Sequence, residues 1–159
     1  MPSSSFLLQI LAILYASVLL AMQTAMASGF AVDVDEHDIA LKGHDPVAYF
    51  TDAKPTMGSA DYTASAEGAT YHFASTDHRD RFLTDPARYT PAYGGFCAFG
   101  VTRGMKITGD PNAWKIVDGK LYINSGPKAF ELWSKDIPGN IKKANEVWPT
   151  IKEKNPVNL

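Results

Sequence analysis

Alternation of apolar and polar positions predicts two β-hairpins in this chain. Residues 62–66 and 70–74 have the composition of paired strands joined by a short glycine-containing connection. Residues 114–117 and 120–124 alternate on either side of an Asp-Gly pair, which is a strong hairpin signal. The apolar run 47–51 follows a Gly-His-Asp-Pro turn, and we expect it to form a further strand.

Helical spacing follows the first hairpin and closes the chain. Ser75 or Thr76 is expected to cap a helix that ends at Pro86. Residues 127–135 predict a short helix, and an Ile-Pro-Gly break is expected to separate it from an amphipathic helix over 141–151. These elements together predict an α+β fold, in which short helices pack on a small antiparallel sheet built from hairpins.

The N-terminus has the pattern of an export signal. Residues 6–22 are almost wholly apolar and are followed by Ala-Met-Ala at 25–27, so we expect residues 1–27 to be a secretory signal peptide. The alternative is an uncleaved membrane anchor, because the apolar stretch is long enough to span a bilayer. We expect a periplasmic or secreted protein with no stable membrane insertion if the signal is cleaved. Residues 28–40 are rich in carboxylates and are expected to form an acidic tether.

Composition limits the remaining chain to one domain and excludes some partners. We expect a single domain over 41–152 and a tail over 153–159. All charged residues follow position 27, and the net charge of −2 gives no electrostatic footprint for nucleic acid. Cys97 is the single cysteine, so it cannot close an intramolecular disulfide. An exported thiol is open to oxidation, and we therefore expect Cys97 to be either shielded or used.

Several segments resemble the YHS-domain family, in its longer exported branch. They are GHDPVAYF (Gly43–Phe50), YHFASTDHRDRFLTDPARY (Tyr71–Tyr89), YGGFCAFGV (Tyr93–Val101), GDPNAWKIVDGKLYIN (Gly109–Asn124) and DIPGNIKKANEVWP (Asp136–Pro149). The resemblance covers nearly all of the chain after the signal and implies a YHS-like fold.

The resemblance also implies where a metal ion would be held. Short YHS domains are thought to bind metal through a cysteine directly after Asp-Pro-Val and a Cys-x-x-x-Cys at a strand-to-helix junction. The corresponding positions here are Ala48, Ala74 and His78. Two thiols are therefore absent and the third is replaced by an imidazole, so the family's thiolate cage cannot be built in its usual form.

Three residues are the candidate metal ligands: His78, Cys97 and His44. His78 falls on the family ligand position, in the first turn of the predicted helix, where a neutral imidazole is expected. Each has a plainer interpretation: His78 as a packing or capping residue, Cys97 as a small buried hydrophobe, and His44 as a surface turn residue. Met57 and Met105 are weaker candidates, whose thioethers suit Cu(I).

Three functions remain open from the sequence. The first is an envelope binding protein that holds a soft transition metal such as copper. The second is a metal-free module that binds a small molecule or a protein. The third, a cysteine-dependent enzyme, is the least favoured, because no nucleophile elbow or phosphate-binding loop occurs. We therefore expect a binding protein that is not an enzyme.

Overall fold

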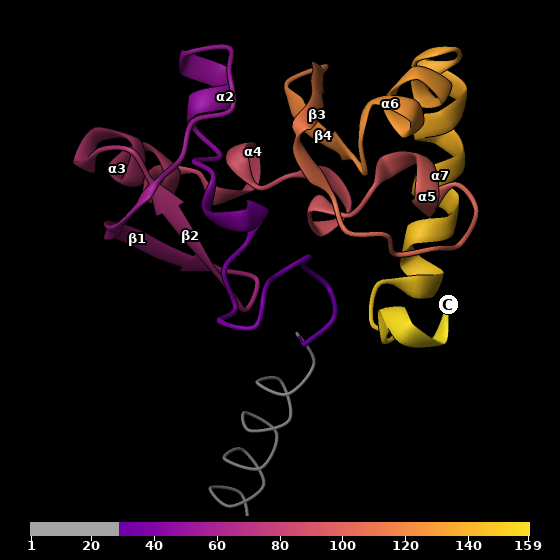
Figure 1. Ribbon diagram of the computed structural model, residues 1–159, viewed down its shortest axis with the longest axis horizontal. Coiled ribbons are helices and arrows are strands. Elements are labelled where there is room, and N and C mark those ends of the chain that lie inside the picture. The colour runs from indigo at the N-terminus through magenta and orange to yellow at the C-terminus, as the bar shows by residue number, and fades with distance from the viewer. Residues whose placement is uncertain (1–28) are drawn as a thin grey trace, which may run out of the picture.

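The computed structural model describes residues 29–159. The predicted signal peptide, residues 1–27, lies outside the described residues. The fold is α+β, with two small antiparallel sheets and several short helices (Figure 1). The elements in chain order are η1 (Leu41–Gly43), α2 (Ala48–Thr51), β1 (Ser59–Ala66), β2 (Ala69–Phe73), α3 (Thr76–Thr84), α4 (Pro86–Tyr89), η2 (Ala92–Gly95), α5 (Ala98–Val101), β3 (Asp110–Val117), β4 (Lys120–Asn124), α6 (Pro127–Ser134), α7 (Ile137–Ile151) and η3 (Pro156–Asn158).

Both predicted hairpins are confirmed, but they form two separate two-stranded sheets instead of one. In the second hairpin Asp118 and Gly119 have φ values of 49° and 74°, the left-handed backbone that a tight Asp-Gly turn requires. In the first hairpin Tyr71 and Phe73 are fully buried, and both rings lie about 5 Å from that of Phe82 on α3.

Strand β4 separates the two parts of the core. Successive side chains of a strand point to opposite faces. Leu121 and Ile123 pack with the residues of β2 and α3, whereas Tyr122 packs with Trp133 of α6 and with α7. Figure 1 accordingly shows the β3–β4 hairpin between the β1–β2 half and the helical half that holds α5, α6 and α7.

The run 47–51, expected as a strand, is instead mostly the helix α2. Its continuous apolar pattern suits a buried helix turn as well as a buried strand. The Asp45 carboxylate decides between them, because Oδ1 accepts from Val47 N at 2.8 Å and from Ala48 N at 3.2 Å. These bonds hold the backbone in a turn and satisfy the first free N–H groups of the helix.

The segment expected as an acidic tether is packed on the domain. Ala31 and Val32 are about 5% exposed and Ala40 is fully buried. Asp33 N donates to Gly94 O, and Ile39 forms a parallel bridge to Thr70 on β2. The acidic composition predicted a tether, but the apolar residues between the carboxylates pack against the domain.

The last helix begins earlier than expected. The Ile-Pro-Gly sequence at 137–139 starts α7 rather than ending α6, because Asp136 caps the helix by accepting from Gly139 N at 3.0 Å. Proline is tolerated in the first turn, where its missing N–H would have no partner. Beyond α7, Lys106 Nζ donates to Lys152 O, Lys154 O and Phe30 O, so it ties both ends of the described chain to the core.

Candidate functional site

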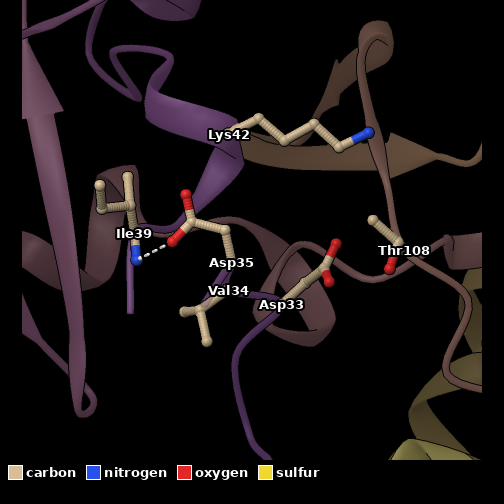
Figure 2. A pocket seen from close by; sticks show the side chains of 6 residues that line it. All are labelled: Asp33, Val34, Asp35, Ile39, Lys42 and Thr108. Atoms are coloured by element: carbon tan, nitrogen blue, oxygen red, sulfur yellow. Dashed lines mark hydrogen bonds between the residues drawn. The ribbon is translucent and has the colours of Figure 1, made fainter. Parts of the chain in front are cut away.

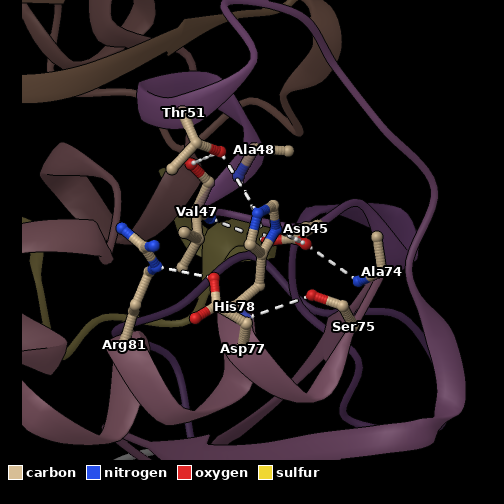
Figure 3. Close-up of polar contacts among 9 residues, drawn as sticks. All are labelled: Asp45, Val47, Ala48, Thr51, Ala74, Ser75, Asp77, His78 and Arg81. Carbon is tan, nitrogen blue, oxygen red and sulfur yellow. Dashed lines mark hydrogen bonds and ion pairs between the residues drawn. The ribbon is translucent and has the colours of Figure 1, made fainter.

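The three positions that the resemblance assigns to ligands meet around one carboxylate. Asp45 is fully buried, and its Oδ2 accepts from Ala74 N at 2.8 Å and lies 2.6 Å from His78 Nδ1 (Figure 3). Its Oδ1 accepts from Ala48 N. The chain therefore brings positions 48, 74 and 78 together through hydrogen bonds to Asp45, which joins the loop before α2 to the start of α3.

His78 is held at both ring nitrogens. Because an ionised carboxylate only accepts hydrogen bonds, Nδ1 is the nitrogen that donates to Asp45. Nε2 lies 3.3 Å from Thr51 Oγ1, whose single hydroxyl hydrogen can be donated either to Nε2 or to Val47 O, which is also 3.3 Å away. The His78 side chain is 13% exposed, and Nδ1 is turned to the fully buried Asp45 carboxylate.

The helix start places His78 in this position. Ser75 is the N-cap of α3, as predicted, and its hydroxyl accepts from His78 N at 3.2 Å. Asp77 lies in the first turn, where a carboxylate interacts favourably with the helix dipole, and it pairs with Arg81 at 2.7 Å on the outer face. The cap and the Asp45 contact together restrict both the backbone and the ring of His78.

Cys97 is a buried residue with structural contacts. It is 1% exposed, its Sγ accepts from Gly100 N at 3.4 Å and lies 3.8 Å from Asn124 Oδ1. The same Asn124 oxygen accepts from Phe99 N at 3.2 Å. The thiol thus caps α5 and links it to β4. Figure 1 places α5 and α3 on opposite sides of the β3–β4 hairpin, so the structure does not bring Cys97 and His78 together.

The contacts of His44 are with Leu41 and Met57. Its Nδ1 is 3.1 Å from Leu41 O, and the residue forms an isolated antiparallel bridge with Met57. Met57 is 61% exposed. Across residues 29–159, no group of three or more His, Cys, Asp or Glu side chains is arranged to hold a metal ion.

A small cavity of about 60 Å³ lies beside the N-terminal segment. Figure 2 shows its lining, with the carboxylates of Asp33 and Asp35 near Lys42 and Thr108. Burial raises the pKa of Asp33 although Gly109 N donates to its carboxylate at 2.8 Å. The pKa of Asp35 is lowered, chiefly by the hydrogen bond from Ile39 N. The volume fits one or two water-sized groups, which is too small for a ligand pocket. The polar residues that line the cavity instead connect the N-terminal segment to the rest of the domain.

Comparisons with protein-family models, with curated proteins and with solved structures return no match. In the part of the chain that the structure describes, no helix is long and apolar enough to cross a membrane. The function must therefore be argued from the site.

Sequence reasoning found His78 and placed Asp45 in a turn, and it missed the contact between them. The two residues are 33 positions apart, and neither periodicity nor spacing reports such a pairing. Thr51 was also missed, because its role depends on α2 being a helix that points this hydroxyl toward His78 (Figure 3).

Proposed function

We propose that this chain is an exported binding protein of the YHS type, periplasmic or secreted, that takes a soft transition metal ion such as copper at Nε2 of His78. The observation that carries the proposal is the 2.6 Å contact between His78 Nδ1 and the buried Asp45 carboxylate. Metal-binding histidines almost always donate their second ring N–H to such a partner, which fixes the ring and makes the ligating nitrogen more basic.

The position of Thr51 is compatible with this use of Nε2. Its hydroxyl has a second partner in Val47 O, so it can keep one hydrogen bond when Nε2 takes an ion. A neutral imidazole is the form that binds metal.

The proposed ligand set differs from the one expected from sequence. Ala48 and Ala74 supply only backbone N–H groups at the other two converging positions. Cys97 is left out because its sulfur is buried against Asn124 and Gly100. The ion would be held by one protein nitrogen from this group, and its remaining positions would be open to water or to donors of another molecule. Such a site favours exchange of the ion over storage.

Copper titration of purified protein tests the proposal. Cu(II) is added to wild type, His78→Ala, Cys97→Ala and His37→Ala, with binding followed by calorimetry and folding checked by circular dichroism. His37 is the matched control, because it is an exposed imidazole in the N-terminal segment. We expect His78→Ala to lower the copper affinity of one binding event at least tenfold or to abolish that event. The other two variants are expected to retain it. Equal binding by wild type and His78→Ala would refute the role of His78.

A metal-free interaction module is the second candidate. It is favoured by the four hydrogen bonds that already surround Asp45, which give the Asp45–His78 pair a complete structural role without any ion. Native mass spectrometry of the protein as purified separates the two candidates. A metal adduct supports the first, and an organic adduct without metal supports the second.

A further inference from the structure

Two soft donor atoms approach the same point above Gly43. A Cβ carbon built on this glycine would lie 3.5 Å from Met57 Sδ and 3.7 Å from His72 Nδ1, and no other heavy atom outside its immediate chain neighbours comes as near. Gly43 has a φ of +78°, so the backbone itself favours a residue without a side chain there. The thioether and the imidazole therefore face a space that no side chain of residue 43 fills.

The backbone around this point is held by three segments. Asp45 N donates to Thr56 O, and Gly58 N donates to Gly43 O, both at 2.8 Å. These bonds bracket His44 and Met57, which makes them a non-hydrogen-bonded antiparallel pair, the kind whose side chains lie closest together. His44 is thus placed beside Met57, and its Nδ1 is engaged with Leu41 O, which leaves Nε2 as its ligand atom.

His72 is fixed against the same loop from the other side. A Cβ on Gly58 would lie only 2.5 Å from the His72 carbonyl carbon, so the loop after Met57 touches the β2 backbone directly. Tyr71 and Phe73 point into the core, and His72 accordingly points to the opposite face of β2. Residues 57 and 72 are therefore brought together by contacts between backbones.

The chemistry of these atoms selects a soft ion. Thioether sulfur favours Cu(I), and imidazole nitrogen suits copper as well, whereas Mg²⁺ and Ca²⁺ prefer oxygen. Met57 is 61% exposed, which is unusual for a residue that more often fills core gaps.

We propose that Met57 Sδ and His72 Nδ1 form a Cu(I) site over Gly43, with His44 as the third donor. His72 must then carry its proton on Nε2. This site shares no ligand with the one proposed at His78, and it stands or falls independently of it. Its three donors come from the η1 exit, the loop before β1 and strand β2.

Silver(I) is the probe for this site, because it shares the soft character of Cu(I) and is not oxidised in air. Purified protein in a Cys97→Ala background, which removes the thiol, is labelled with ¹³C at the methionine methyl groups and titrated with Ag(I) in NMR. We expect the Met57 methyl resonance to shift with saturation at one ion, together with a ring resonance of His72. The Met105 methyl resonance is the internal control and is expected to stay in place.

Variants identify the ligands. Met57→Leu and His72→Ala are each expected to lower Ag(I) affinity at least tenfold, whereas Met105→Leu, His37→Ala and His78→Ala leave this event unchanged. His44→Ala is expected to weaken binding less than His72→Ala, because Met57 Sδ and His72 Nδ1 are the two atoms that approach the same point above Gly43. A Met57 resonance that does not respond to Ag(I), or a response that survives both His72→Ala and His44→Ala, would overturn the proposal. An Ag(I) event that His78→Ala removes and that Met57→Leu and His72→Ala leave unchanged would refute this site.

Discussion

Asp45 is the residue on which the geometry around His78 depends. It is fully buried, and its two oxygens together receive four hydrogen bonds from residues 47, 48, 74 and 78. Hydrogen bonds to a charged group contribute more than neutral ones, and removing the acceptor leaves buried donors without partners.

We predict that Asp45→Asn destabilises the protein by about 2–4 kcal/mol. The replacement has nearly the same shape, but its amide NH₂ would face Ala74 N–H and His78 Nδ1–H or, after a flip, the N–H groups of residues 47 and 48. Urea unfolding followed by tryptophan fluorescence measures the loss. Asp77→Asn is the control, because its ion pair with Arg81 is exposed and screened by solvent. Equal stability of the two variants would show that Asp45 is not a structural centre.

At the scale of single residues, the sequence predicted the chemical type and local setting of a residue better than its contacts with distant residues. It placed Asp45 in a turn and identified the imidazole at position 78, because both follow from residue type and local spacing. It left Cys97 open between burial and use, and the fold settles only its environment, with Asn124 of β4 beside the sulfur. A contact across 27 positions has no local signature.

Among the elements, α3 connects stability to the candidate site. Its N-cap Ser75 accepts from the backbone N–H of His78, so the cap and the candidate ligand share one turn. A serine cap typically contributes about 1 kcal/mol.

We predict that Ser75→Ala lowers the free energy of unfolding by about 1 kcal/mol and also weakens the copper event assigned to His78. The second effect is expected because a frayed first turn no longer holds the imidazole at the surface. Thermal unfolding and copper calorimetry on the same samples measure both. Ser134→Ala, an exposed serine at the end of α6, is the control and is expected to change stability by less than about 0.5 kcal/mol. Loss of stability without any change in copper binding would separate the cap from the site.

Elements with local signals were predicted well, and those set by distant contacts were not. The Asp-Gly hairpin of β3 and β4, the capped helix α3 and the short helix α6 all follow from turn residues and periodicity. Helix α2 was predicted as a strand, because four apolar residues in a row fit either state and the deciding hydrogen bonds come from Asp45 outside the run.

For the molecule as a whole, the N-terminal segment packs as an integral part of the domain. Asp33 N donates to Gly94 O and its carboxylate accepts from Gly109 N, so this one residue joins three distant segments. Burial raises the pKa of Asp33 above its ordinary value of 3.8, which means that the folded state disfavours the ionised carboxylate.

We predict that Asp33→Asn makes the protein more stable than wild type at neutral pH. A carboxyl whose pKa is raised on folding contributes stability at pH values below 3.8 and loses it as the pH rises through the folded-state pKa. The asparagine oxygen still accepts from Gly109 N and carries no charge to desolvate. The difference between variant and wild type in urea unfolding should therefore grow as the pH rises above 3.8 and level off once the pH exceeds the folded-state pKa.

Glu146→Gln on the exposed face of α7 is the control for this experiment and should give a difference that does not depend on pH in this way. A stability difference for Asp33→Asn that stays constant across the range would contradict the assigned role of burial.

The sequence by itself determined the fold class, the two hairpins, most helix positions and the residue types available for chemistry. These features depend on turn residues, caps and periodic apolar positions, which act over a few residues. Only the tertiary structure decided that residues 31–40 pack on the domain, that 48, 74 and 78 meet at Asp45, and that Met57 and His72 face Gly43. The physical reason is that these contacts join segments far apart in the chain, and burial and backbone pairing select them only once the whole core has formed.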